Sequence, residues 1–176
     1  MKSTRGSKRA ARLRSEIAVA LDTDGYVEWD EASDYVEKLS AVLERIEEAG
    51  KSSPSIALDA VLYFIKEIPE VFNSVHDECE LGMFCTDLTE TAVALGKKAG
   101  GGRLRETAEC LIRAYLADAT DTCRFNDVPD ILAKGWRFKN DKKVVAEAAV
   151  VQAKGAEARE AAVLKALAEK LWGSRR

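Results

Sequence analysis

Apolar residues recur at helical spacing along most of this chain. Between residues 25 and 49 they fall at alternating steps of four and three positions, with charged side chains filling most places between them; the apolar set is Ala32, Val36, Leu39, Leu43 and Ile46. Steps of this kind place one apolar stripe along an α-helix. A single amphipathic helix leaves its stripe in water, so this segment predicts a helix that packs against further helices.

Similar stripes predict helices through the rest of the chain, and turn-forming residues mark their ends. The expected helices run over 8–21, from 54 onward, over about 78–98, over about 104–116, and over the short stretch 128–135. Ser53-Pro54 is typical of a helix start, and Gly100 with its two following glycines predicts a helix end. The helix from Pro54 is apolar almost all round, which predicts a place in the middle of the core. Pro69 is expected to kink that helix or to end it at Ile68.

The segment from 141 to 172 is rich in alanine. Its candidate core contacts are Val144, Ala148, Val151, Ala158, Ala162, Leu167 and Leu171. Gly155 lies inside it, and a glycine within a helix costs about 1 kcal/mol relative to alanine. The pattern therefore fits either one kinked helix or two helices.

Together these patterns predict an all-α fold. About seven helices, each with one stripe and joined by short turns, indicate antiparallel helical hairpins stacked side by side, as a short α-solenoid or a bundle. We divide the chain into a disordered basic arm over 1–7, a helical-repeat domain over 8–135, an Ala-rich helical segment over 136–172 and a tail over 173–176.

Composition narrows the class of protein. With 176 residues, of which 47% are hydrophobic and 32% charged, the chain resembles a soluble globular domain. It has no run of about 18 apolar residues, so no transmembrane helix is expected. No apolar signal-peptide core follows the basic start. We therefore expect a cytoplasmic, bacterial-type protein with no membrane partner.

Charge is distributed unevenly along the chain. The net charge is −3, yet the first 14 residues contain no acidic residue and several basic ones, namely Lys2, Arg5, Lys8, Arg9, Arg12 and Arg14. Such a cluster can bind phosphates. It suggests an alternative hypothesis, a nucleic-acid-associated accessory protein that uses this arm. Interleaved aromatic residues and a base-reading motif are lacking, so sequence-specific recognition is not expected.

A second alternative is calcium binding at the turn after the first predicted helix. Asp22, Asp24, Glu28 and Glu31 would occupy positions three, five, nine and twelve of an EF-hand loop. The first position would fall on Ala20, which has no side-chain oxygen. The competing interpretation is an acidic turn without a metal.

Cysteine and histidine give little support for metal or catalytic chemistry. His76, Cys79 and Cys85, with Cys110 or Cys123, are spaced too loosely for the usual zinc motifs. His76 is the sole histidine, so one imidazole at most could act as a base. The glycines at 100–102 lack the Lys-Ser/Thr pair of a phosphate-binding loop. We therefore expect no catalytic residues, no resident metal or cofactor, and reduced cysteines.

Several blocks of the sequence carry a resemblance to a known family: Arg12–Arg14, Gly25–Trp29, Ala60–Phe72 followed by Asp77, and Leu111–Leu116 with Phe125 and Pro129–Gly135. Over about residues 8–135 they resemble a bacterial family of helical-repeat proteins of unknown function, relatives of which occur attached to SWIM-type zinc fingers. The resemblance implies an α-solenoid with tetratricopeptide-like packing and implies no catalytic residues. Family members usually continue through further repeats, and the Ala-rich end has no counterpart in them. The Cys-x-Cys and Cys-x-His pairs of a SWIM finger are absent from this sequence.

Many amphipathic helices and little recognisable chemistry favour a non-enzymatic module for protein–protein interaction. Stacked hairpins leave a groove or an open end that a partner's helix or peptide can fill. On this hypothesis the Ala-rich segment caps the stack, docks on a second copy of the chain or joins another protein.

Overall fold

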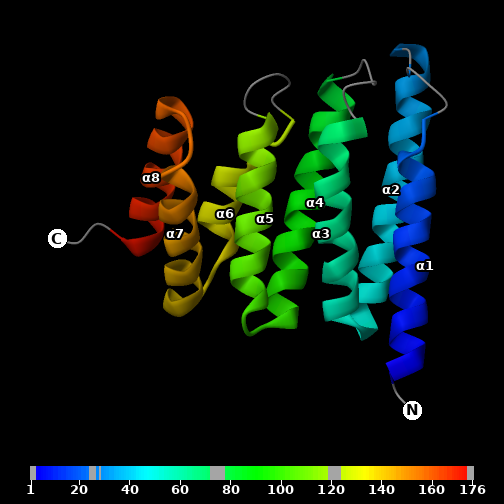
Figure 1. Ribbon diagram of the computed structural model, residues 1–176, viewed down its shortest axis with the longest axis horizontal. Coiled ribbons are helices and arrows are strands. Elements are labelled where there is room, and N and C mark those ends of the chain that lie inside the picture. Colours follow the sequence, from blue (N-terminus) through cyan, green and yellow to red (C-terminus); the bar gives the residue numbers. More distant parts are fainter. Residues whose placement is uncertain (1–2, 24–26, 28, 72–77, 119–123, 174–176) are drawn as a thin grey trace.

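Figure 1 shows the fold as a computed structural model, which describes residues 3–23, 27, 29–71, 78–118 and 124–173. These residues form eight α-helices: α1 (Ser3–Leu21), α2 (Trp29–Ser52), α3 (Pro54–Val71), α4 (Glu78–Ala99), α5 (Arg103–Asp118), α6 (Val128–Gly135), α7 (Lys139–Ala153) and α8 (Ala158–Trp172). The predicted all-α fold is confirmed. None of the described helices combines the length and the apolar composition needed to cross a bilayer.

The helices lie in two layers (Figure 1). α1, α3, α5 and α7 pack side by side in one layer, and α2, α4, α6 and α8 pack side by side in the other. Successive helices run in opposite directions, so the helices within one layer are parallel to each other. The arrangement is therefore a row of antiparallel helical hairpins, with the two ends of the chain at opposite ends of the row.

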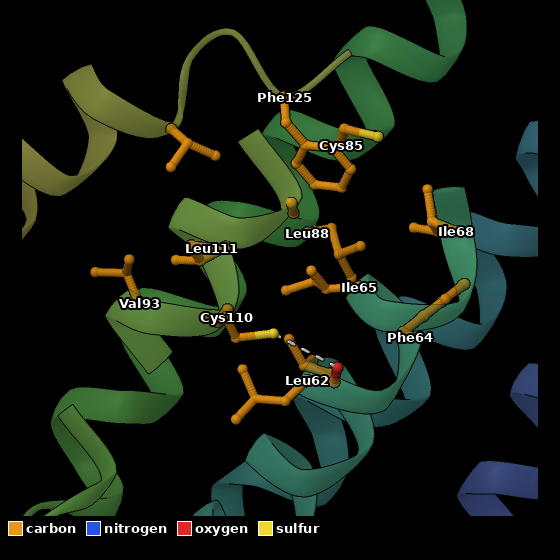
Figure 2. Close-up of a cluster of buried hydrophobic side chains, with 14 of the residues drawn as sticks. Leu62, Phe64, Ile65, Ile68, Cys85, Leu88, Val93, Cys110, Leu111 and Phe125 are labelled. Atoms are coloured by element: carbon orange, nitrogen blue, oxygen red, sulfur yellow. Dashed lines mark hydrogen bonds between the residues drawn. The ribbon is translucent and has the colours of Figure 1, made fainter. Parts of the chain in front are cut away.

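α3 occupies the middle of the core, as its apolar sequence predicts. It contacts α1, α2, α4 and α5, and its side chains Leu58, Phe64 and Ile65 are buried. The centroid of the Phe64 ring lies 5.5 Å from that of Phe84 on α4, with the rings tilted by 58°. Figure 2 shows side chains of α3, α4 and α5 meeting in this cluster.

Two predicted helix ends are confirmed. α4 ends at Ala99, and the next two residues, Gly100 and Gly101, have φ angles of +67° and +58°. Glycine adopts this left-handed conformation without the steric cost that a side chain would add, so it suits a helix C-terminus. α6 spans Val128–Gly135, as predicted.

Other boundaries differ from the prediction. α1 begins at Ser3 rather than near Lys8, so the helix includes residues 3–7, for which a disordered arm was predicted. α1 packs along α3, and a Cβ atom at Gly6 would lie 3.4 Å from Cδ1 of Ile56, so this contact reaches into the first turns of the helix. α3 continues past Pro69 to Val71.

The Ala-rich segment forms two helices, α7 and α8, because the chain turns between Lys154 and Glu157. In that turn the Gly155 N–H donates to the carbonyl of Gln152 over 3.2 Å. Of the predicted core contacts, Ala148, Leu167 and Leu171 are buried, Val144 is half-buried, and Val151, Ala158 and Ala162 are exposed. The turn interrupts the helical periodicity. The predicted contacts match only some of the core-facing positions of α7 and α8.

Candidate functional site

The layer of even-numbered helices carries two adjoining hollows. One, of about 590 Å³, lies between α2 and α4, and the other, of about 450 Å³, lies between α4 and α6. Glu90 and Ala94 of α4 line both hollows. We treat the two hollows as one groove, here called the even-face groove, that crosses α2, α4 and α6 and is divided by the α4 ridge at Glu90 and Ala94.

Two bands of opposite charge flank this groove. In α2, α4 and α6, the carboxylates of the groove precede the lysines, which lie nearer the C-terminal end of the helix. For α6 the carboxylates include Asp127, which immediately precedes the helix. The acidic band consists of Glu44, Glu47, Asp87, Glu90, Asp127 and Asp130, and the basic band consists of Lys51, Lys97, Lys98 and Lys134. The three helices run in the same direction (Figure 1), and the contacts of Thr86 with Asp127 and of Thr91 with Glu47 fix their register, so both bands cross the groove from α2 to α6.

Apolar residues form the floor of the hollow between α4 and α6. Val93, Ala94 and Ile131 line it together with Gly135. At Gly135 a Cβ atom would lie 2.8 Å from Cγ1 of Val93, which is closer than packed carbon atoms normally approach. Glycine at this position therefore lets α4 and α6 come close together, and their approach shapes the hollow.

Several rim side chains are held by contacts within the chain. The Thr91 hydroxyl donates to Glu47 over 2.7 Å, which links α4 to α2. Asp130 pairs with Lys170 of α8 at 3.6 Å. The Lys97 ammonium lies 5.6 Å from the centroid of the buried Trp136 ring, a cation–π contact. These contacts hold the two ends of the groove in place.

Other charges of the groove have no such partners. Glu44, Asp87, Glu90, Lys98 and Lys134 are exposed, and among the described residues their side chains form no ion pair or hydrogen bond. An exposed charge without a partner keeps its full capacity to pair with a ligand. The central part of each band is thus available to a binding partner.

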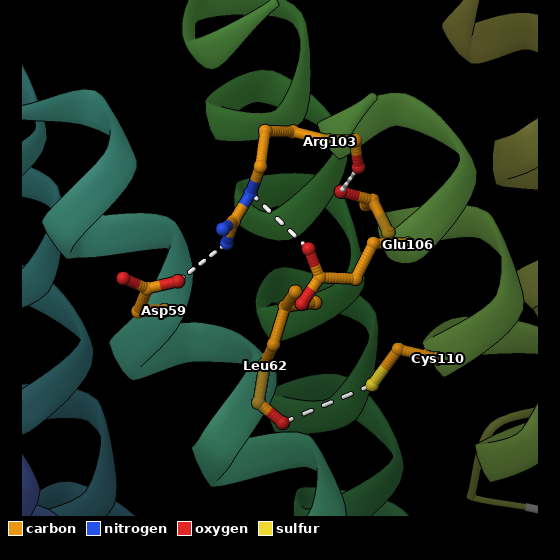
Figure 3. A network of polar contacts seen from close by, with 6 residues as sticks. Asp59, Leu62, Arg103, Glu106 and Cys110 are labelled. Atoms are coloured by element: carbon orange, nitrogen blue, oxygen red, sulfur yellow. Dashed lines mark hydrogen bonds and ion pairs between the residues drawn. The ribbon is translucent and has the colours of Figure 1, made fainter. Parts of the chain in front are cut away.

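A third hollow, of about 310 Å³, lies on the opposite layer between α3 and α5, with Cys110 among its lining residues. The Cys110 thiol donates to the Leu62 carbonyl with a sulfur–oxygen distance of 3.8 Å. Beside it, Arg103 of α5 pairs with Asp59 of α3 and with Glu106 (Figure 3). Burial raises the pKa of Cys110 to about 11, so near neutral pH it is a thiol and a weak nucleophile.

Only some of the predicted metal ligands lie among the described residues. Asp22 and Glu31, from the calcium hypothesis, are exposed, while Asp24 and Glu28 lie outside the described residues. Cys85 is buried on α4, and burial raises its pKa well above the usual value for a thiol. His76, Cys123 and the side chain of Cys79 also lie outside the described part of the chain. In the part of the chain that the structure describes, no three His, Cys, Asp or Glu residues form a group that could hold a metal ion.

All of the predicted nucleic-acid residues except Lys2 lie on α1, where several contact the chain itself. Arg9 donates to Ser52 at the end of α2 over 2.8 Å, and Arg12 pairs with Glu16 at 2.8 Å. The Arg14 guanidinium lies 5.6 Å from the centroid of the Tyr63 ring on α3. Lys8 is exposed, whereas Lys2 and the side chain of Arg5 lie outside the described residues. Arg9 and Arg14 therefore help to attach α1 to α2 and α3, whereas the Arg12 pair lies within α1.

The sequence analysis missed the even-face groove. A signal was present, because Glu44 and Glu47 precede Lys51, Asp87 and Glu90 precede Lys97, and Asp127 and Asp130 precede Lys134. Read helix by helix, these charges indicate only a solvated face. Their meaning depends on the side-by-side placement of α2, α4 and α6.

Comparison of the chain with protein-family models, with curated proteins and with solved structures finds no match. The resemblance to a helical-repeat family therefore stays a prediction, and function has to be argued from the geometry of this chain alone.

Proposed function

We propose that this chain is a non-enzymatic helical module for protein–protein interaction, and that the even-face groove is its binding surface. The observation that carries the proposal is the meeting of two hollows at Glu90 and Ala94, between an acidic and a basic band. Grooves between packed helices commonly hold a segment of another protein. The bands supply the polar rim that such interfaces have around a less polar centre.

Two further observations favour binding over the alternative activities. The described thiols, Cys85 and Cys110, are buried and kept protonated, which disfavours nucleophilic catalysis. Arg9, Arg12 and Arg14 contact residues of their own chain, which lowers the support for phosphate binding by the N-terminal helix. No specific contact in the described residues favours the calcium hypothesis.

Site-specific photo-crosslinking tests the proposal. A photoreactive residue at Ala94, in the centre of the groove, is expected to capture a protein partner in cells. The same residue at Ala41, which is exposed on α2 and does not line the groove, serves as the control. Equal capture from both positions would contradict the proposal.

The captured partner is then purified and its affinity measured by calorimetry. Ala94→Arg is expected to weaken binding by at least about tenfold, because a bulky charge at the centre of an interface has to be desolvated. Ala41→Arg is expected to leave the affinity unchanged. Ala94 is exposed, so both variants should retain the helical circular-dichroism spectrum. An unchanged affinity for Ala94→Arg would place the binding surface elsewhere.

A further inference from the structure

The spacing of the two hollows restricts the shape of the partner. They lie on the two sides of α4, so their centres are separated by about one interaxial distance between packed helices, roughly 8–10 Å. In an α-helix, residues seven positions apart lie on the same face and are separated by about 10.5 Å. In an extended strand, same-face residues are separated by about 6.6 or 13 Å, which fits the two hollows less well.

The ridge between the hollows permits close approach. Glu90 and Ala94 are the exposed ridge residues that line both hollows; Glu90 belongs to the acidic band, whereas the side chain of Ala94 is a single methyl group. A helix lying across α4 can therefore bring its backbone near the ridge while a side chain enters each hollow. A larger residue in place of Ala94 would hold the partner away from both hollows.

The charge bands restrict the flanks of the partner. Glu44, Asp87 and Glu90 have no partner among the described residues on one side of the groove, and Lys98 and Lys134 have none on the other. A segment in the groove must place cations over the acidic band and carboxylates over the basic band, since like charges brought together are costly. A helix with one cationic flank and one acidic flank satisfies both bands at once.

Resting on the function proposed above, we infer that the even-face groove binds an amphipathic helix of another protein that crosses α2, α4 and α6. This helix carries two apolar anchors seven residues apart, cations along the flank over the acidic band and carboxylates along the other flank. The two unlike flanks also set the direction in which the helix lies, because reversing it would bring like charges together.

A synthetic peptide tests this partner class. The probe is a fluorescein-labelled helical peptide with two leucines seven residues apart, arginines along one flank and glutamates along the other. Its binding to the full chain is measured by fluorescence anisotropy at low ionic strength, where surface charges are least screened. Ala94→Arg is expected to weaken binding at least about tenfold, whereas Ala41→Arg is expected to have no effect. A peptide with its leucines four residues apart is expected to bind at least about tenfold more weakly.

Charge reversal supplies the sharper control. Glu44, Asp87 and Glu90 are exposed and unpaired, so the triple variant Glu44→Lys, Asp87→Lys, Glu90→Lys is expected to fold. It should lose affinity for the probe and prefer a peptide with glutamate on both flanks, a switch of at least about tenfold in relative affinity. Unchanged preference would overturn the inference, as would equal binding of an extended, proline-containing peptide of similar composition.

The two proposals can fail separately. If the peptides do not bind but a partner captured at Ala94 is still lost in Ala94→Arg, the groove is an interaction surface and the inferred partner class is wrong. If neither the peptides nor a cellular partner depend on Ala94, both proposals are wrong. Capture of a second copy of this chain or of a nucleic acid at Ala94 would likewise overturn the inference.

Discussion

At the scale of single residues, two glycines of α4 differ in whether they restrict helix packing. A Cβ atom at Gly96 of α4 would lie 2.8 Å from Oγ1 of Thr107 and 3.3 Å from its Cβ. Thr107 is buried on α5, and its hydroxyl donates to the carbonyl of Arg103 over 2.8 Å. At Gly82, on the same helix, a Cβ atom would meet nothing within 4 Å. Gly96 therefore sets the approach of α4 to α5, whereas Gly82 does not restrict packing.

This difference predicts opposite changes in stability. Gly96→Ala is expected to lower the free energy of unfolding by about 1–3 kcal/mol, because the buried threonine cannot move aside cheaply. Gly82→Ala is expected to raise it by up to about 1 kcal/mol, since alanine is the better helix former. Urea denaturation followed by circular dichroism measures both. Stabilisation by Gly96→Ala would show that α5 yields at this contact.

At the scale of elements, alanine has different roles in α7 and α8. Ala146, Ala148 and Ala149 of α7 are fully buried, and α7 packs against both α5 and α8. Ala162 of α8 is exposed. Buried alanines permit close approach of helices, and exposed ones add only helix propensity. The alanines of α7 therefore fill its interfaces with neighbouring helices, whereas most of those of α8 lie on its exposed side and Ala168 is buried.

A matched pair of substitutions tests this assignment. Ala149→Leu is expected to cost about 1–3 kcal/mol of stability, because three extra carbon atoms have to fit into a filled interface. Ala162→Leu is expected to change stability by no more than about 0.5 kcal/mol, as for other surface positions. Thermal unfolding of the two variants beside the parent protein gives the comparison. Similar losses at both positions would mean that the outer side of α8 is covered by another molecule, and that loss should then depend on protein concentration.

At the scale of the whole molecule, the hairpins differ in how many neighbours support them. α3 contacts α1 and α5 in its own layer and α2 and α4 in the other layer, whereas α8 contacts α6 and α7. In stacked helical hairpins, stability comes from each unit and from its interfaces with adjacent units. The centre of the row should therefore open less often than its C-terminal end.

Amide hydrogen exchange measures this gradient directly. The slowest amides are expected in α3, α4 and α5, and those of α8 are expected to exchange at least about tenfold faster, which corresponds to about 1.4 kcal/mol. Mass spectrometry of peptic fragments resolves the helices separately. Equal protection of α3 and α8 would show instead that the chain opens as one cooperative unit.

Much of the fold could be predicted because its determinants are local. The stripe that begins at Ala32 and the Ser53-Pro54 start signal each depend on a few adjacent residues, and the structure confirms helices at both places. The start of α1 was predicted too late, since residues 3–7 contain no apolar stripe, yet α1 begins at Ser3 and packs against α3. The candidate site could not be predicted in the same way, because Glu44, Glu90 and Asp130 belong to different helices.

Sequence alone determined that the chain is helical, where most of its helices end, and that α3 lies in the core, because helical periodicity, capping and apolar content act over short distances. Only the tertiary structure decided which alanines are buried, which arginines attach α1, and that three carboxylate–lysine patterns combine into one groove. Those outcomes depend on which helices lie next to each other and in which direction, and packing across the whole chain sets both.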